Sequence, residues 1–510
     1  MRVYYGKTSG TISALVGKRK KHVIWGDWLE VEDHPTDSSK HIVNWRAWDA
    51  RTKTVRIDKY AVKRDDCQSE ALLEMIFLDV GQGDGCIVNV PDGKKQRTMV
   101  IDAGQHGNMH GFLDWRFRNV DANCKFDTAI ITHPDSDHYL GFRAIFDDPR
   151  FHFRQVLHNG LLERDAADSD RIGSCKNGRC TELFPTRAAA KTFLSDAAVR
   201  GKTLYANLIW GAIKDTARFG DVAMASAEHG TKVADRTYLP GYEPAGADSA
   251  AIEILGPVPE KVGGKWTLRA FGDKPHDGNF NVGKTKNGHS VILRLTLRDF
   301  SVIFGGDLNR PSEDYLLRHY GEIADDVTAL SAAVAKARKR FSADLLKCCH
   351  HGSADVTDEF LDSVQPFAFV VSSGDEESHV HPRPEILGLL GKKGRGERPL
   401  VLCTEILRST PESKRLSDAE KAQHEKLMTA LEAATTTETR KLARRGISDF
   451  WNRRFARLVN VYGAINIRTD GRELIVGFLK EKKGSGSPWQ LYKYKRTGDD
   501  WKGVELKSGH

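Results

Sequence analysis

Thr132-His133-Pro134-Asp135-Ser136-Asp137-His138 is the stretch on which the interpretation of the whole chain depends. It follows Thr128–Ile131, an apolar, β-branched run that predicts a buried strand ending where a loop begins. The stretch offers two imidazoles and two carboxylates, from His133, Asp135, Asp137 and His138. A loop at a strand end can turn these side chains towards one point, and the set suits one or two divalent ions that keep an open position for water. The stretch therefore predicts a metal site.

Two further strand ends carry residues of the same kind. Ser301–Phe304 leads into Gly305-Gly306-Asp307-Leu308, and Leu345–Cys349 leads into His350-His351. Strands fix the direction of the side chains at their ends, while the loops leave room for a substrate. A lone Gly-Asp or His-His pair is a common turn, but three such clusters, each behind an apolar run, predict one scaffold built around a metal site.

Length and composition indicate a multi-module globular protein. The chain has 510 residues, of which 40% are hydrophobic and 29% charged, and about three modules are expected at this length. No run approaches the roughly 18 apolar residues that span a bilayer. Met1–His22 holds only the short apolar patch Ile12–Gly17 before a Lys/Arg cluster, which is unlike a secretory signal. We therefore expect a cytoplasmic protein without a membrane partner.

Charge and cysteine content add weaker constraints. The formal net charge of +8, from 77 basic and 69 acidic residues, favours phosphate-bearing substrates without choosing among them. Eight cysteines in so long a chain do not predict a disulfide framework. Cys175 and Cys180 flank a four-residue segment that a metal or a disulfide could close. Because the sequence offers no second pair of cysteines to go with them, we expect Cys175 and Cys180 to be ordinary loop thiols.

Changes in composition along the chain predict four parts. Residues 1–68 alternate like a small all-β, SH3-like module, whose tryptophans could form a ligand groove or a core. Residues 69–405 alternate strands and helices around the metal-ligand clusters, with an insertion over about 160–248. Residues 406–457 form a basic helical segment, and residues 458–510 return to β-strands.

The basic helical segment could contact nucleic acid. Its cations could track a phosphate backbone, or they could form the solvated face of a helix; the sequence favours neither. The residues concerned are Arg440, Lys441, Arg444, Arg445, Arg453, Arg454 and Arg457.

The chain resembles the metallo-β-lactamase fold, in particular the branch found as the hydrolase domain of ComEC-type competence proteins and in related stand-alone proteins. The resemblance spans about residues 72–405. The residues that carry it are Phe77–Asp84, Ile101–Gly104, Thr132–His138, Ile252–Pro257, His289–Leu295, Gly305–Leu308, His350–Ser353 and His381-Pro382.

The resemblance implies an αββα sandwich with two divalent ions, Zn²⁺ or Mn²⁺, at one edge of the sheets. His133 and Asp135 would bind the first ion, Asp137 and His138 the second, and Asp307 would bridge them. His350 directly follows its strand and is therefore the expected last ligand, with His351 left to donate hydrogen bonds or contact substrate. Asp84 and Asp102 would orient imidazoles, although structural turns would explain them too.

The sequence departs from the family pattern at two places. Asp135 stands where the family at large has His, and a hard oxygen ligand shifts preference towards manganese or magnesium without excluding zinc. The histidine usually contributed between the opening motif and Asp307 is not obvious. His158 and His289 are the candidates, each with an uncharged loop role as the alternative.

Two ions held in this way suit in-line attack on a phosphodiester, so the resemblance favours a nuclease. Asp137 would orient the attacking water, and His351 or His381 would stabilise phosphoryl oxygens or protonate the leaving group. One alternative is hydrolysis of a small phosphoester or a phosphorylcholine-type head group. Another is a non-catalytic binding or signalling module that meets a protein partner through the N-terminal β module.

Overall fold

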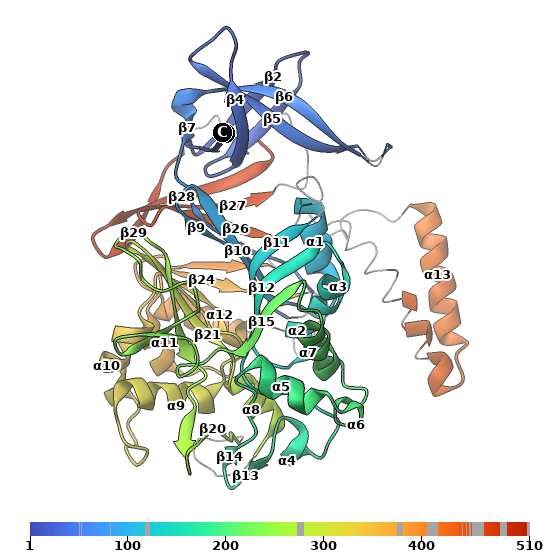
Figure 1. The fold of residues 1–510 in the computed structure, drawn as a ribbon, viewed down its shortest axis with the longest axis vertical. Coiled ribbons are helices and arrows are strands. Elements are labelled where there is room, and N and C mark those ends of the chain that lie inside the picture. Colours follow the sequence, from blue (N-terminus) through green and yellow to red (C-terminus); the bar gives the residue numbers. More distant parts are fainter. Residues whose placement is uncertain are drawn as a thin grey trace.

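The computed structural model describes the chain except residues 50, 53, 82, 118–122, 273–279, 375–380, 405–416, 441, 445, 448–449, 451–463, 480–486 and 507–510. Two large sheets pack face to face, helices cover their outer faces, and a small all-β unit lies at one end of the molecule (Figure 1). The expected mixed α/β architecture with several sheets is thereby confirmed.

The first large sheet has ten strands, in the order β15-β12-β11-β10-β9-β8-β26-β27-β28-β29. Their bounds are β8 Leu73–Phe77, β9 Gly85–Asp92, β10 Lys95–Ala103, β11 Cys124–Ile131, β12 Phe151–His158, β15 Phe219–Met224, β26 Ile465–Thr469, β27 Glu473–Leu479, β28 Trp489–Thr497 and β29 Asp500–Val504. β10, β11, β12 and β15 are parallel, so their carboxyl ends meet at one edge of the sheet.

The second large sheet has eight strands, in the order β16-β17-β18-β21-β22-β23-β24-β25. Their bounds are β16 Thr231–Val233, β17 Arg236–Tyr238, β18 Ala251–Gly256, β21 Ile292–Leu297, β22 Phe300–Phe304, β23 Leu345–Lys347, β24 Ala368–Val371 and β25 Leu400–Cys403. β22 to β25 are parallel, so the loops that carry Asp307 and His350-His351 leave the sheet at the same edge.

Three apolar layers hold the two sheets and their helices together. Between the sheets, Phe77 of β8 stacks on Phe304 of β22 with 6.2 Å between ring centroids. The helices over the ten-stranded sheet include α1 Asn108–Phe117, α2 Ser136–Tyr139, α3 Gly141–Asp147, α5 Arg187–Leu194 and α7 Leu204–Lys214. Those over the eight-stranded sheet are α9 Arg310–Gly321, α10 Ser331–Phe341, α11 Asp358–Val364 and α12 Pro384–Lys393. The layer order is helices, sheet, sheet, helices.

Shorter elements connect these layers. They are α4 Asp168–Arg171, α6 Ala197–Arg200, α8 Val282–Gly288, the 3₁₀ turns η1 Arg64–Asp66 and η2 Cys349–Gly352, and a four-stranded sheet. The strands of that sheet are β13 Cys175–Lys176, β14 Arg179–Cys180, β19 Glu260–Val262 and β20 Lys265–Arg269.

The N-terminal residues form a seven-stranded sheet, in the order β3-β2-β6-β5-β4-β1-β7, with a core of its own. The bounds are β1 Arg2–Tyr5, β2 Ser9–Ala14, β3 Lys20–Ile24, β4 Trp28–Asp33, β5 Lys40–Asp49, β6 Thr54–Lys63 and β7 Cys67–Gln68. Trp25 packs with Leu72, directly before β8, and with Ile475 of β27, so this tryptophan belongs to a core. The SH3-like assignment stays a prediction.

Much of the segment predicted as an insertion is integral to the fold. Leu208, Ile209 and Ala212 of α7 pack against the ten-stranded sheet. Phe219–Met224 forms β15, which pairs in parallel with β12 and extends that sheet. The insertion over about 160–248 stays a prediction, and the apolar residues of this segment cover and extend the sheet.

The prediction that Cys175 and Cys180 are free thiols is wrong, because the structure joins them in a disulfide. They face each other across the hairpin of β13 and β14, with 3.9 Å between their Cα atoms. Asn177 and Gly178 form its turn, both with positive φ. An Asn-Gly pair is the sequence signal for such a two-residue turn, and it brings the two sulfur atoms together.

The C-terminal strands continue the ten-stranded sheet, since β26 pairs with β8. Before them, α13 Asp418–Glu432 lies apart from the sheets (Figure 1). Of the predicted basic contacts, Arg440 and Arg444 are exposed, whereas Lys441, Arg445, Arg453, Arg454 and Arg457 lie outside the described residues. None of the helices in the described part of the chain combines the length and apolar character that a bilayer crossing requires.

Arg468 of β26 connects the C-terminal strands to both preceding parts of the chain. Its buried guanidinium donates to Glu74 Oε1 on β8 (2.9 Å) and to Asp27 Oδ1 (2.8 Å) and Trp25 O (2.7 Å) of the N-terminal unit. Burial opposes its charge, but Glu74 and Asp27 raise the pKa of Arg468 above its ordinary value. The ion pairs therefore stabilise the junction.

Replacing this cation is expected to destabilise the protein. Arg468→Met removes one of the positive charges that pair with the buried carboxylate of Glu74. The free energy of unfolding should therefore fall by about 3 kcal/mol. Denaturant unfolding followed by tryptophan fluorescence measures the change. The matched control is Arg472→Met at an exposed position on the adjoining turn, which should stay within about 0.5 kcal/mol of wild type. Equal effects in the two variants would contradict the assignment.

Candidate metal centre

The loop after β11 is fixed at its base by Asp102, near the end of the neighbouring β10. Asp102 accepts hydrogen bonds from the backbone N of Thr132 (2.8 Å) and from Thr132 Oγ1 (2.7 Å). Its backbone has a φ of 52°, in the left-handed region that aspartate tolerates better than most non-glycine residues. The loop that carries His133–His138 therefore starts from a fixed point.

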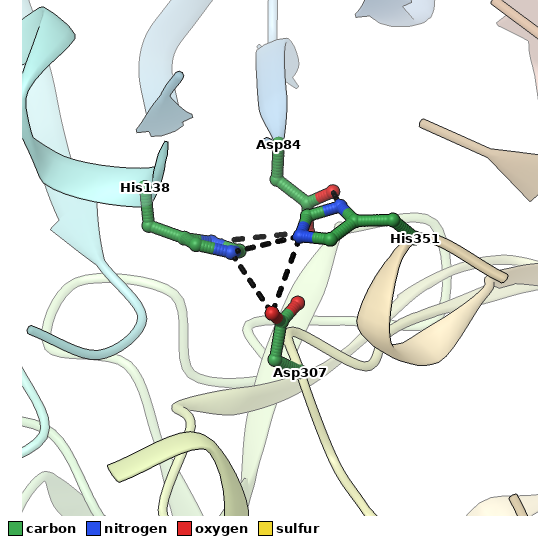
Figure 2. A group of neighbouring side chains, drawn as sticks. All are labelled: Asp84, His138, Asp307 and His351. Atoms are coloured by element: carbon green, nitrogen blue, oxygen red, sulfur yellow. Dashed lines mark hydrogen bonds and ion pairs between the residues drawn. The ribbon is translucent and has the colours of Figure 1, made fainter. Parts of the chain in front are cut away.

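Beyond this point four buried side chains converge, two from each large sheet (Figure 2). Asp84 precedes β9 and His138 lies in α2, while Asp307 follows β22 and His351 follows β23. Asp307 Oδ2 lies 3.1 Å from His138 Nε2 and 3.2 Å from His351 Nε2, and the two Nε2 atoms are 3.3 Å apart. Nitrogen and carboxylate donors gathered in this way can hold a divalent metal ion.

Each of the two convergent histidines has a carboxylate behind it. His138 Nδ1 lies 2.8 Å from Asp102 Oδ2. His351 Nδ1 lies 3.0 Å from Asp84 Oδ1 and makes a hydrogen bond of 3.2 Å with Ser372 O. A carboxylate at Nδ1 fixes the tautomer and the ring orientation, and it leaves Nε2 as the donor to an ion. Asp84 and Asp102 thus lie where groups that orient imidazoles are expected.

The buried charges keep the carboxylates ionised. Lys347 of β23 donates to Asp84 Oδ2 and to Gly306 O (3.2 Å). Burial by itself would raise the pKa of Asp84, but Lys347 and His351 lower it. Burial also opposes ionisation of Asp307, yet His138 and His351 hold its pKa well below the ordinary value. Both carboxylates therefore offer oxygen lone pairs towards the centre.

The position expected for His350 is taken by His351. His350 and His351 both have positive φ, 49° and 52°. These two consecutive left-handed residues turn the chain so that His351, one residue further from the strand, faces Asp307. Backbone in this region costs of order 1–3 kcal/mol per residue and is retained mainly at functional sites. The geometry favours His351 over the predicted His350 as the ligand, and His350 lies half-buried beside the group.

His133 and Asp137 lie at the edge of the cluster. His133 Nε2 is 3.9 Å from Asp307 Oδ2 and makes no hydrogen bond within the described part of the chain. Asp137 Oδ2 is 3.6 Å from His351 Nε2. Gly83 permits this arrangement, because a Cβ at position 83 would lie 1.7 Å from the backbone oxygen of Asp137.

Asp135 faces a buried lysine that sequence reasoning missed. Lys286 of α8 is 6% exposed, and its Nζ lies 2.9 Å from Asp135 Oδ1 and 3.3 Å from Glu163 Oε1. The signal was faint, because Lys286 stands in a short polar helix just before β21. Its partners lie more than 100 positions earlier in the chain.

The other histidine candidates lie outside the four-residue cluster. His158 Nδ1 accepts a hydrogen bond from the backbone N of Gly160 (3.0 Å), and His289 Nε2 lies 2.6 Å from Arg269 O. Burial lowers the pKa of both rings to about 4. The ring of His381 lies 5.8 Å from that of His350, and both are half-buried at the rim.

The residues present fit a divalent ion. His133 Nε2 and Asp307 Oδ1 are buried without a hydrogen-bond partner among the described residues, and buried polar atoms are normally satisfied. Asp137, His138, Asp307 and His351 together supply imidazole nitrogens and carboxylate oxygens of the kind that zinc and manganese accept. The buried Asp/His cluster therefore indicates divalent metal binding, without fixing the metal.

Comparison with known proteins gives limited similarity. No protein-family model matches the chain. A stretch of 107 residues is 29% identical to ComE operon protein 3 of Bacillus subtilis (strain 168), and it covers 21% of this chain but only 12% of that protein.

Two solved structures are similar at a low level. A variant of CmlA beta-hydroxylase has 13% identity and a TM-score of 0.29, over 65% of this chain and 52% of that chain. A metallo-beta-lactamase from Hirschia baltica has 10% identity and a TM-score of 0.23, over 65% of this chain and 95% of that chain. Likeness at this level establishes neither an activity nor a ligand.

Loss of the carboxylate behind His138 should weaken metal binding. Asp102→Asn keeps a residue that tolerates positive φ but removes the charge at Nδ1, so the dissociation constant for Mn²⁺ or Zn²⁺ should rise by about 10–100-fold. Isothermal titration calorimetry measures it. Asp326→Asn, at an exposed position, is the control. An unchanged constant in correctly folded Asp102→Asn would refute the orienting role.

Buried His158 should make stability depend on pH. Its pKa of about 4 in the folded state lies below the ordinary value of about 6.5, so the unfolded chain binds more protons between these limits. Stability is therefore lost as the pH falls through this window. Replacing His158 by Leu should reduce the loss of unfolding free energy between pH 7 and 4.5 by about 2–3 kcal/mol.

Denaturant unfolding at the two pH values tests this expectation. His152→Leu, on the same strand but half-buried, controls for removal of a histidine from β12. A pH dependence that is identical in wild type and His158→Leu would contradict the assignment.

Proposed function

We propose that this protein is a metal-dependent phosphodiesterase that cleaves nucleic acid. The observation that carries the proposal is the convergence of His138, Asp307 and His351 at 3.1–3.3 Å, with a carboxylate behind each imidazole. Together with Asp137, these side chains would hold the ion. Such an ion supplies Lewis-acid polarisation of a phosphoryl oxygen and acidifies the attacking water.

The side chains around the ion would position the substrate. The carboxylate of Asp137 is partly exposed beside His351, so it can accept a hydrogen bond from a water and orient it. His350 and His381 lie together at the rim. Their rings are half-buried, so they can contact phosphoryl oxygens or donate a proton to a leaving oxygen.

Three further observations support nucleic acid as the substrate. The motifs resemble the ComEC-type branch, and ComE operon protein 3 matches a fifth of the chain. The net charge of +8 favours a polyanion. Arg440 and Arg444 are exposed beyond the sheets, where they could contact a phosphate backbone. Zn²⁺ or Mn²⁺ is the proposed ion, since nitrogen and carboxylate donors are mixed.

Location and partners stay predictions. A protein partner could bind the N-terminal β unit. A cytoplasmic location is in tension with the Cys175–Cys180 disulfide, because such bonds persist mainly in oxidising compartments.

The proposal predicts metal-dependent cleavage. Purified protein with Mn²⁺ or Zn²⁺ should cut DNA or RNA, and Asp307→Ala should slow cutting by more than about 100-fold, because removing a ligand costs more than removing its hydrogen-bond partner. Gel assays with fluorescent oligonucleotides measure the rate, and substrate binding should weaken at high salt. Asp326→Ala is the matched control.

Other outcomes would point elsewhere. Turnover of a small chromogenic diester, with no cleavage of any nucleic acid, would replace the nuclease by a small-phosphoester hydrolase. Purified protein that carries no metal and binds none would rule out both enzymes and leave a binding module.

A further inference from the structure

Lys286 lies beside Asp135, one of the ligands expected for the first ion. Its ammonium contacts Asp135 Oδ1 at 2.9 Å and Glu163 Oε1 at 3.3 Å, and a weaker contact of 3.5 Å reaches Pro134 O. Only 6% of the residue is exposed. A buried ammonium needs paired carboxylates, because isolated charges are costly to remove from water. The three residues therefore form one charged unit.

Both oxygens of Asp135 are occupied by protein donors. Lys286 donates to Oδ1, and Asn287, in the amide orientation that satisfies both of its polar ends, donates to Oδ2 at 3.0 Å. A divalent ion bound to Asp135 would lie next to the ammonium of Lys286, which is 2.9 Å from Oδ1, and the two positive charges would repel each other. Arg171 Nε donates a hydrogen bond to Glu163 Oε1 at 3.0 Å. This contact holds the Glu163 carboxylate in place beside Lys286.

Without Asp135, the first ion position keeps too few ligands. Of the ligands expected there, His133 and Asp307 remain, with 3.9 Å between His133 Nε2 and Asp307 Oδ2. His289 Nε2 already contacts Arg269 O, and His158 Nδ1 already accepts from Gly160. Zinc sites use three or four protein ligands. An ammonium, by contrast, is a compact positive charge that needs only the carboxylates already present.

We propose that the ammonium of Lys286 takes the place of the first of the two expected divalent cations, the one assigned to His133 and Asp135, so that each chain binds one ion, at Asp137, His138, Asp307 and His351. The inference rests on the proposed metal-dependent function and replaces the two ions that the resemblance implies by one. Lys286 is a positioning residue, because it fixes Asp135 and contributes positive charge beside His133 without touching the reacting atoms.

Metal stoichiometry tests the inference directly. Protein saturated with Mn²⁺ and freed of excess is analysed by elemental analysis, and the bound Mn²⁺ by electron paramagnetic resonance. Wild type should hold one ion per chain with the spectrum of an isolated ion. Lys286→Met frees Asp135, so it should hold two ions with a magnetically coupled spectrum, while Lys286→Arg keeps the charge and should stay at one.

The control variant is Lys284→Met, on the same helix and paired instead with Asp355, which should stay at one ion. Two ions in the wild type would overturn the inference but leave the metal-dependent function standing. A folded Lys286→Met that still holds one ion would overturn it as well. Wild type that binds no ion would refute both proposals.

Discussion

The structure depends on two carboxylate–imidazole contacts, Asp102 with His138 and Asp84 with His351. Both carboxylates come from the ten-stranded sheet, but His351 and Asp307 come from the eight-stranded one. The site therefore forms only when the two sheets are correctly placed relative to each other. The apolar layer between the sheets sets the distances among the atoms of the site. The geometry of the site therefore depends on the packing of the sheets, since a shift of one sheet relative to the other would separate the ligands.

Opposite charges also pair across the interface between the two sheets. A carboxylate from the ten-stranded side meets a buried lysine from the other side: buried Asp84 meets Lys347, and half-buried Asp135 meets Lys286. Leaving any of these charges unpaired would be costly. Their pairing helps to align the sheets and limits how much further positive charge the site can accept.

The sequence predicted what local pattern controls. Apolar runs ending in His133–His138, Asp307 and His350-His351 identified the strand ends, and parallel pairing brought those ends together. The sequence did not show which of His350 and His351 faces Asp307, because two consecutive left-handed residues that are not glycine have no sequence signal. Nor could it find Lys286, whose partners come from distant segments. The Asn177-Gly178 pair predicts a hairpin turn, and this turn would have indicated that Cys175 and Cys180 face each other.

The pairing of β26 with β8 has a consequence for the order of folding. Arg468 and Glu74 are separated by 394 positions, so the middle of the ten-stranded sheet closes only after β26 has left the ribosome. Until then β8 presents an unpaired edge, and such edges recruit other strands. Contacts this distant in sequence form slowly. The nascent protein thus passes through a stage in which its central sheet is open to association with other chains.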